Sequence, residues 1–304
     1  MHRFSPYASF ALALAATACL TAPAFASTAT TEFASSVASY SASTVSNPNG
    51  SIGQFATSEG GYAIDPFFPP YPQAASDSYP AVLTTVKSGG SLTLKFPTAD
   101  RATGAYLGIY SSVGLINVNS TVGGPPQAAS SGTITLSTPS EAVVSVSADG
   151  TNFVALNQGN PIIFDNPTNA YITVDDTIVS SGGYTFVSPQ PAAPGVTPQL
   201  AAATPFMGNV SEFAGKTESQ ILSLLGNTAG GTWISPSSLS ATGLSTIQFV
   251  RFTVPTGDTA FINAAALSDE PPVVAPEPAA LGLLLIPAIG LLATKRRSTV
   301  RPGR

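Results

Sequence analysis

Short runs in which apolar and polar residues alternate dominate the middle of the chain. Residues 91–96 place Leu92, Leu94 and Phe96 on one face and polar side chains on the other, which is the period of a half-buried strand. Further strand-like runs cover residues 132–136, 142–147, 152–156, 161–164, 171–174, 184–187, 247–254 and 261–267. Many short strands separated by Gly and Pro turns predict an all-β fold, an antiparallel β-sandwich over residues 81–270.

Two local signals refine this picture. Asp149-Gly150 between two alternating runs predicts a hairpin turn. Thr217, which can cap a helix, precedes Gln220 and a leucine-rich run that ends at Gly226, and this pattern predicts one short helix.

The segments outside these runs are rich in small residues or proline. Residues 27–50 are mostly Ser, Thr, Ala and Asn, and residues 62–80 mix prolines with aromatic rings, so residues 27–80 are expected to form a flexible lead-in. Residues 188–205 contain five prolines and are expected to form a long loop inside one domain, the alternative being an interdomain linker.

The N-terminus has the features of a secretory signal peptide. Arg3 precedes a short apolar stretch and the small-x-small pattern of Ala24 and Ala26, so residues 1–26 are expected to be cut off by signal peptidase. The alternatives are a buried N-terminal helix and a lipoprotein anchored through Cys19, whose preceding residues make a poor lipobox.

The C-terminus combines an apolar tract with a basic tail. Residues 279–293 are apolar but shorter than the usual membrane span of about 20 residues, and Pro287 lies within them. Five of the eleven basic residues of the chain follow within its last ten positions, an arrangement that keeps a tail cytoplasmic. We therefore expect an apolar C-terminal helix that holds the tail in the membrane.

Residues 274–278 (VAPEP), the glycine-bearing apolar tract and the triplet Lys295-Arg296-Arg297 follow one another in a specific order. Residues 271–304 thus resemble the PEP-CTERM sorting signal of exopolysaccharide-producing Gram-negative bacteria. The resemblance implies the membrane protease exosortase as a partner and a final location in the cell envelope, at the cell surface or in the extracellular matrix. It makes Pro276, Glu277 and Pro278 recognition elements for cleavage. The alternative is a plain C-terminal anchor.

The body carries a second resemblance. The hairpin at residues 144–154, the strand at 247–254 with its aromatic-apolar-Arg run, and the strand at 89–96 are similar to parts of discoidin and galactose-binding-like jelly rolls. That resemblance implies a jelly-roll sandwich whose end loops often bind sugars or another surface, without identifying the ligand.

Charge and composition exclude several functions. Five basic and all sixteen acidic residues lie between Ser27 and Pro278, which gives this body a formal net charge of −11 and argues against nucleic-acid binding. The single His2 and Cys19 both lie in the expected leader. A mature body without His or Cys cannot form a Ser-His-Asp or Cys-His catalytic site, nor a metal site with His or Cys ligands, within one chain.

The acidic residues remain as candidates for catalysis or for calcium binding. Asp175 and Asp176 are adjacent, so on a strand they point to opposite faces and cannot form a glycosidase pair by themselves. Asp149, Asp165, Asp175 and Asp176 are weak candidates for calcium, although no EF-hand or nonapeptide pattern is present and no cofactor is expected. The alternative reading is ordinary Asp and Asn turn chemistry.

Aromatic side chains are the candidate ligand contacts. Tyr62, Phe67, Phe68 and Tyr71 lie among prolines, which would preorganise a sugar-stacking surface, and they could equally cover an open end of the sandwich. Trp233 is a further candidate contact, although a single Trp is more often a core anchor.

Together these observations predict an exported, tail-sorted surface or matrix protein. Its body is expected to be non-enzymatic and to serve adhesion, matrix structure or binding of carbohydrate such as exopolysaccharide. The rival readings are a carboxylate-dependent hydrolase or lyase acting on polysaccharide, and a purely structural protein.

Overall fold

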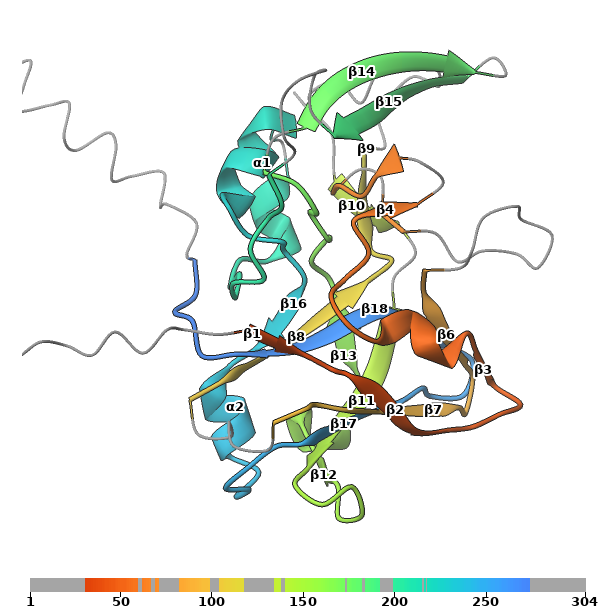
Figure 1. Cartoon of the computed structure of the whole chain (residues 1–304), viewed down its shortest axis with the longest axis vertical. Coiled ribbons are helices and arrows are strands. Elements are labelled where there is room, and N and C mark those ends of the chain that lie inside the picture. The colour runs from red at the N-terminus through yellow and green to blue at the C-terminus, as the bar shows by residue number, and fades with distance from the viewer. Residues whose placement is uncertain are drawn as a thin grey trace, which may run out of the picture.

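The computed structural model describes residues 31–59, 62–66, 69–70, 82–98, 104–117, 134–137, 140–172, 174–181, 184–191, 199–214, 216 and 218–273. Within these residues the chain is mostly β, with two six-stranded antiparallel sheets and few helices (Figure 1). The predicted all-β, antiparallel sandwich is confirmed at this level.

The first sheet, sheet A, has the order β16-β8-β18-β6-β3, with β1 also paired to β18. Its strands are β1 (Thr31–Phe33), β3 (Val45–Ser46), β6 (Thr84–Lys87), β8 (Tyr106–Ser111), β16 (Thr232–Ile234) and β18 (Thr259–Ser268). The second sheet, sheet B, has the order β12-β11-β17-β7-β2, with β13 also paired to β11. Its strands are β2 (Ser36–Tyr40), β7 (Ser91–Lys95), β11 (Ser140–Ser147), β12 (Val154–Ala155), β13 (Ile162–Phe164) and β17 (Phe249–Thr253).

Smaller elements complete the described chain. Three two-stranded ribbons are β4 (Ser58–Glu59) with β5 (Tyr62–Ala63), β9 (Gly114–Asn117) with β10 (Ile134–Ser137), and β14 (Val174–Ser181) with β15 (Tyr184–Pro191). The helices are η1 (Pro48–Ser51), η2 (Asn157–Gly159), η3 (Val210–Phe213), α1 (Glu218–Leu225) and α2 (Pro236–Ser240).

The main core lies between the two sheets. Alternate residues of the sheet B strands point inward and are fully buried, as the period-two pattern requires, among them Leu92, Leu94, Val144, Val250 and Phe252. They pack with inward residues of sheet A in one cluster.

A second apolar cluster lies on the other face of sheet A. Tyr110 of β8 and Trp233 of β16, which alternate with the inward residues of their strands, pack there with Phe55 and with Phe213 of η3. Strand β18 therefore has apolar residues on both faces, and its run from Ala264 to Leu267 is buried without alternation. Helix α1 contributes buried leucine and isoleucine side chains to the same cluster.

The N-terminal segment departs from the expected flexible lead-in. Strand β1 pairs with β18, β2 with β7 and β3 with β6, so residues 31–46 belong to both sheets and the sandwich does not begin at residue 81. The physical reason is that these strands are bound through backbone hydrogen bonds, which Ser, Thr and Ala supply as well as larger residues do. A few side chains, such as the buried Ala34 and Val45, complete the packing.

Several predicted elements shift in their limits. The predicted helix is α1, and it ends before Gly226, whose φ of 59° favours glycine. The hairpin at Asp149-Gly150 has a longer loop than a two-residue turn, because β11 and β12 pair only from Val146 opposite Val154. Asp175 and Asp176 lie inside β14, whereas a polar turn was expected there. Residues 188–191, expected in a loop, extend β15.

Among the described residues, no helix is long and apolar enough to span a membrane. The predicted signal peptide (residues 1–26) and apolar C-terminal helix lie outside the described residues.

Candidate functional site

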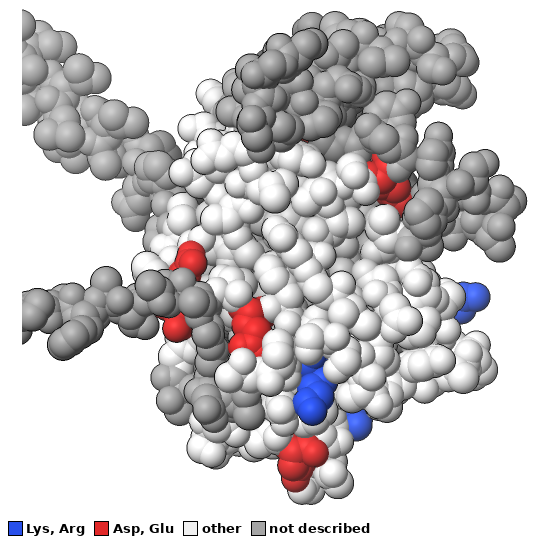
Figure 2. Space-filling model, viewed as in Figure 1, with Lys and Arg blue, Asp and Glu red and all other residues white. Residues whose placement is uncertain are grey.

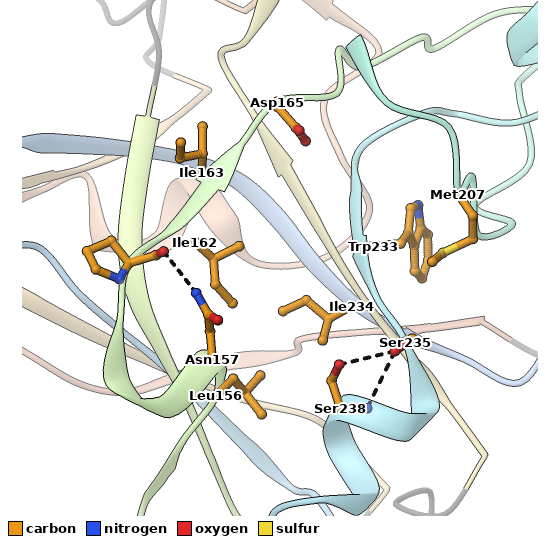
Figure 3. Close-up of a pocket in the computed structure, with 11 residues that line it drawn as sticks. Leu156, Asn157, Ile162, Ile163, Asp165, Met207, Trp233, Ile234, Ser235 and Ser238 are labelled. Atoms are coloured by element: carbon orange, nitrogen blue, oxygen red, sulfur yellow. Dashed lines mark hydrogen bonds between the residues drawn. The ribbon is translucent and has the colours of Figure 1, made fainter. Parts of the chain in front are cut away.

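A surface pocket opens where the edges of the two sheets meet (Figure 3). It lies between β13, at an edge of sheet B, and β16, at an edge of sheet A, and has a cavity volume of about 530 Å³. That volume is within the usual range of about 300–1,000 Å³ for small-molecule sites.

The floor of the pocket is apolar. Ile162 and Ile234 face each other across it, with Leu156 below them in the view of Figure 3. Two further lining residues are unusually exposed for their type, Ile163 at 54% and Met207 at 42%. Exposed apolar side chains beside a hollow are typical of a contact surface, because water hydrates them poorly.

The rim carries polar groups from two local structures. Ser235 is the N-cap of α2, where its Oγ accepts from the backbone N–H of Ser238 at 3.4 Å. The two hydroxyls are 3.1 Å apart. Across the pocket, Asn157 in η2 donates from Nδ2 to the carbonyl of Pro161 at 3.4 Å. These groups leave hydroxyl and amide hydrogen-bonding capacity at the rim.

Asp165 adds a carboxyl at the top of the pocket in the view of Figure 3. Burial raises the pKa of Asp165, and hydrogen bonds from its own backbone N–H and the Thr232 hydroxyl lower it in part. Thr232 Oγ1 lies 3.4 Å from Asp165 Oδ1 and accepts from the Asp165 N–H at 3.0 Å. A half-desolvated carboxyl held in this way is a strong hydrogen-bond partner for a ligand hydroxyl.

Trp233 lines the pocket from β16 but is only 7% exposed. Its Nε1–H donates to the Gly230 carbonyl at 2.8 Å, and its ring packs edge-on against Tyr110 with centroids 6.0 Å apart. The indole is therefore mainly a core residue, and only its small exposed part forms one side of the pocket.

The four calcium candidates are not assembled into a described metal site. Among the described residues, no group of three or more His, Cys, Asp or Glu side chains is placed to hold a metal ion. Asp149 is exposed and uses its carboxylate to hold the β11–β12 loop, whereas Asp165 is in the pocket. For Asp175 and Asp176 only the backbone in β14 is described.

The other sequence-predicted site residues fall largely outside the described structure. Tyr62 is described only by its place in β5, and Phe67, Phe68 and Tyr71 lie outside the described residues. The same holds for the sorting residues Pro276, Glu277, Pro278, Lys295, Arg296 and Arg297 and for the signal-cleavage residues Ala24 and Ala26.

Sequence reasoning identified Trp233 and Asp165 separately but missed the pocket that joins them. Asn157, Ile163, Met207 and Ser238 have no motif around them. A comparison with protein-family models, curated proteins and solved structures finds no significant match to the chain.

Proposed function

We propose that this chain is an exported cell-surface or matrix protein whose non-enzymatic sandwich binds carbohydrate in the pocket between β13 and β16. The observation that carries this proposal is the mixture of an apolar floor, exposed Ile163 and Met207, and a rim of hydroxyl, amide and carboxyl groups. A sugar unit presents apolar C–H faces and hydroxyls together, and such a lining complements both.

Export and sorting are proposed from the two ends of the sequence. The expected signal peptide directs the body out of the cytoplasm, and the PEP-CTERM-like tail supplies a membrane stop and an exosortase recognition motif around Glu277. Exopolysaccharide made by the same cell is then the proposed carbohydrate.

The finer fold assignment, a discoidin-like or galactose-binding-like jelly roll, is part of this proposal. The three runs that carry the resemblance form β7, β11 with β12, and β17, and these strands are neighbours in sheet B in the order β12-β11-β17-β7. That these three runs lie side by side in one sheet supports the jelly-roll assignment.

The rival function is a carboxylate-dependent hydrolase or lyase. Glycoside hydrolysis in most families uses two carboxyls about 5–10 Å apart across a cleft. Asp165 is the one carboxylate among the described residues that line this pocket. The arrangement therefore favours binding over hydrolysis.

The test is calorimetric titration of the full chain, in mild detergent, with oligosaccharides cut from the producing organism's own exopolysaccharide. Ser238 is an exposed rim residue on α2, so Ser238→Tyr should fill the pocket without disturbing the core. We expect saturable binding by the wild type and at least a tenfold loss in this variant, about 1.4 kcal/mol.

Ser240→Tyr is the matched control, because Ser240 is exposed on the same helix but does not line the pocket. It should bind like the wild type. Absence of binding by the wild type, or an equal loss in both variants, contradicts the proposed site. Shortening of the oligosaccharides would favour the hydrolase or lyase instead, and loss of binding on adding EDTA would add calcium to the site.

A further inference from the structure

The outward face of sheet B carries two basic side chains on neighbouring cross-strand rows. In one row Lys95 lies opposite Phe249, and in the next row Arg251 lies opposite Thr93. Diagonal neighbours of this kind are about 7–8 Å apart. We call Lys95, Phe249 and Arg251, together with Phe153 from the adjoining loop, the cationic face; Thr93 is buried and supports it.

Arg251 is held in a defined position. Its guanidinium carbon lies 3.6 Å from the centroid of the Phe153 ring, and its Nε donates to Thr93 Oγ1 at 3.2 Å. A guanidinium group has five N–H donors. Within the described part of the chain, the bond to Thr93 is the one hydrogen bond that the Arg251 guanidinium makes. The terminal N–H groups are therefore available to an anionic ligand.

Lys95 repeats the arrangement one row away. Its Nζ lies 5.6 Å from the centroid of the Phe249 ring. In the described residues no ion pair joins either Lys95 or Arg251 to a carboxylate. Figure 2 shows two patches of basic side chains on the lower part of the molecule, with acidic patches beside them and mostly uncharged residues around both.

We propose that the cationic face is a second ligand surface, which binds acidic polysaccharide through the carboxylates of its uronate units. Charge complementarity supplies the attraction, and the half-buried rings of Phe153 and Phe249 provide apolar area for the sugar C–H groups. Two cations on successive rows suit an extended polymer with repeated negative groups better than a single small anion.

The negative charge of the body does not prevent this contact. The Debye length is about 8 Å at physiological ionic strength, so acidic groups elsewhere on the molecule are largely screened. Two acidic groups lie near the cationic face. Asp149 is in the loop whose Gly150 packs beside Phe249, and its carboxylate already accepts hydrogen bonds from Thr151 and Asn152. Glu32 lies near the end of β7, and its carboxylate already accepts a hydrogen bond from the backbone N–H of Thr98.

The inference is independent of the pocket and is tested with a different probe. Full chain in mild detergent is titrated with polygalacturonate and, in parallel, with neutral dextran. We expect binding to polygalacturonate that weakens as salt is raised, and at least a tenfold loss in either Arg251→Gln or Lys95→Gln. Arg251→Lys should lose part of the affinity, because lysine keeps the charge but not the planar fork of donors.

Lys87→Gln is the control, because Lys87 is an exposed lysine on β6 of sheet A, and it should bind within twofold of the wild type. Ser238→Tyr should also bind polygalacturonate normally, which separates this surface from the pocket. Circular dichroism and thermal melting check that each variant is folded.

Three results would overturn the proposal. The first is the absence of wild-type binding, and the second is an equal loss in Lys87→Gln, which would indicate non-specific charge attraction. The third is equal binding of a single-stranded oligonucleotide with the same dependence on Arg251, which would mean that the face recognises polyanions rather than polysaccharide.

Discussion

At the scale of single residues, Asp149 shows how one exposed carboxylate organises a loop. Its Oδ1 accepts from the backbone N–H of Thr151 at 2.7 Å and of Asn152 at 2.8 Å, and from the Ser147 hydroxyl at 3.0 Å. Its Oδ2 accepts from Asn152 Nδ2 at 2.8 Å. The backbone N–H groups of Asn152 and Thr151, followed by the side chains of Asn152 and Ser147, lower the pKa of Asp149 well below its usual value.

This shift predicts a pH-dependent stability effect. A carboxyl whose pKa is lower in the folded than in the unfolded state stabilises the fold above its unfolded pKa, about 3.9, and loses that contribution as pH falls. Asp149→Ala should therefore lower the melting temperature at pH 7, and the difference from wild type should shrink steadily below about pH 4.

Asp149→Asn, which keeps one acceptor oxygen, should lie between the two proteins at pH 7. Thermal melts of all three across pH 2–7 provide the measurement. A difference between wild type and Asp149→Ala that stayed constant with pH would show that the charge of Asp149 has no such role.

At the scale of elements, the contact between β8 and β16 sets the wall of the pocket. Gly108 lies opposite Trp233 in the ladder, and a Cβ at position 108 would come within 2.6–2.8 Å of three atoms of the indole ring. The indole has little freedom to move, because its N–H is bonded to Gly230. The glycine thus allows the large ring to lie flat over the neighbouring strand.

Gly108→Ala should destabilise the protein by about 1–3 kcal/mol, the usual cost of overpacking a well-packed core. Urea unfolding at equilibrium measures the change. The same substitution in a Trp233→Leu background should cost clearly less, because residues in contact have non-additive effects. An equal loss of unfolding free energy in both backgrounds would mean that Gly108→Ala does not act through its contact with Trp233.

The elements that the sequence predicts best are those with one apolar and one polar face. Strands β7, β11 and β17 and helix α1 all lie where alternation or capping placed them. Strand β8 was not predicted, since apolar residues occupy both of its faces and no alternation marks it. Strands β1 to β3 were missed because backbone pairing, rather than side-chain hydrophobicity, joins them to the sheets.

At the scale of the whole molecule, both proposed ligand surfaces depend on the sandwich topology. The pocket brings η2 and β13 of one sheet edge against β16 and α2 of the other, far apart in sequence. The cationic face requires β7 and β17 to pair in register, although they are separated by about half of the chain. No local motif encodes such long-range pairings, so the sequence alone could not identify the residues of either proposed surface.

The central claim is that the chain is an exported, tail-sorted protein that acts with polysaccharide outside the cell. Intact-mass spectrometry of the protein recovered from the extracellular polysaccharide fraction of producing cells tests it most directly. We predict a polypeptide that begins at Ser27 and ends near Pro276-Glu277-Pro278, and a Glu277→Ala variant that keeps its tail in the membrane fraction. An uncleaved chain of 304 residues found inside the cell would contradict the account.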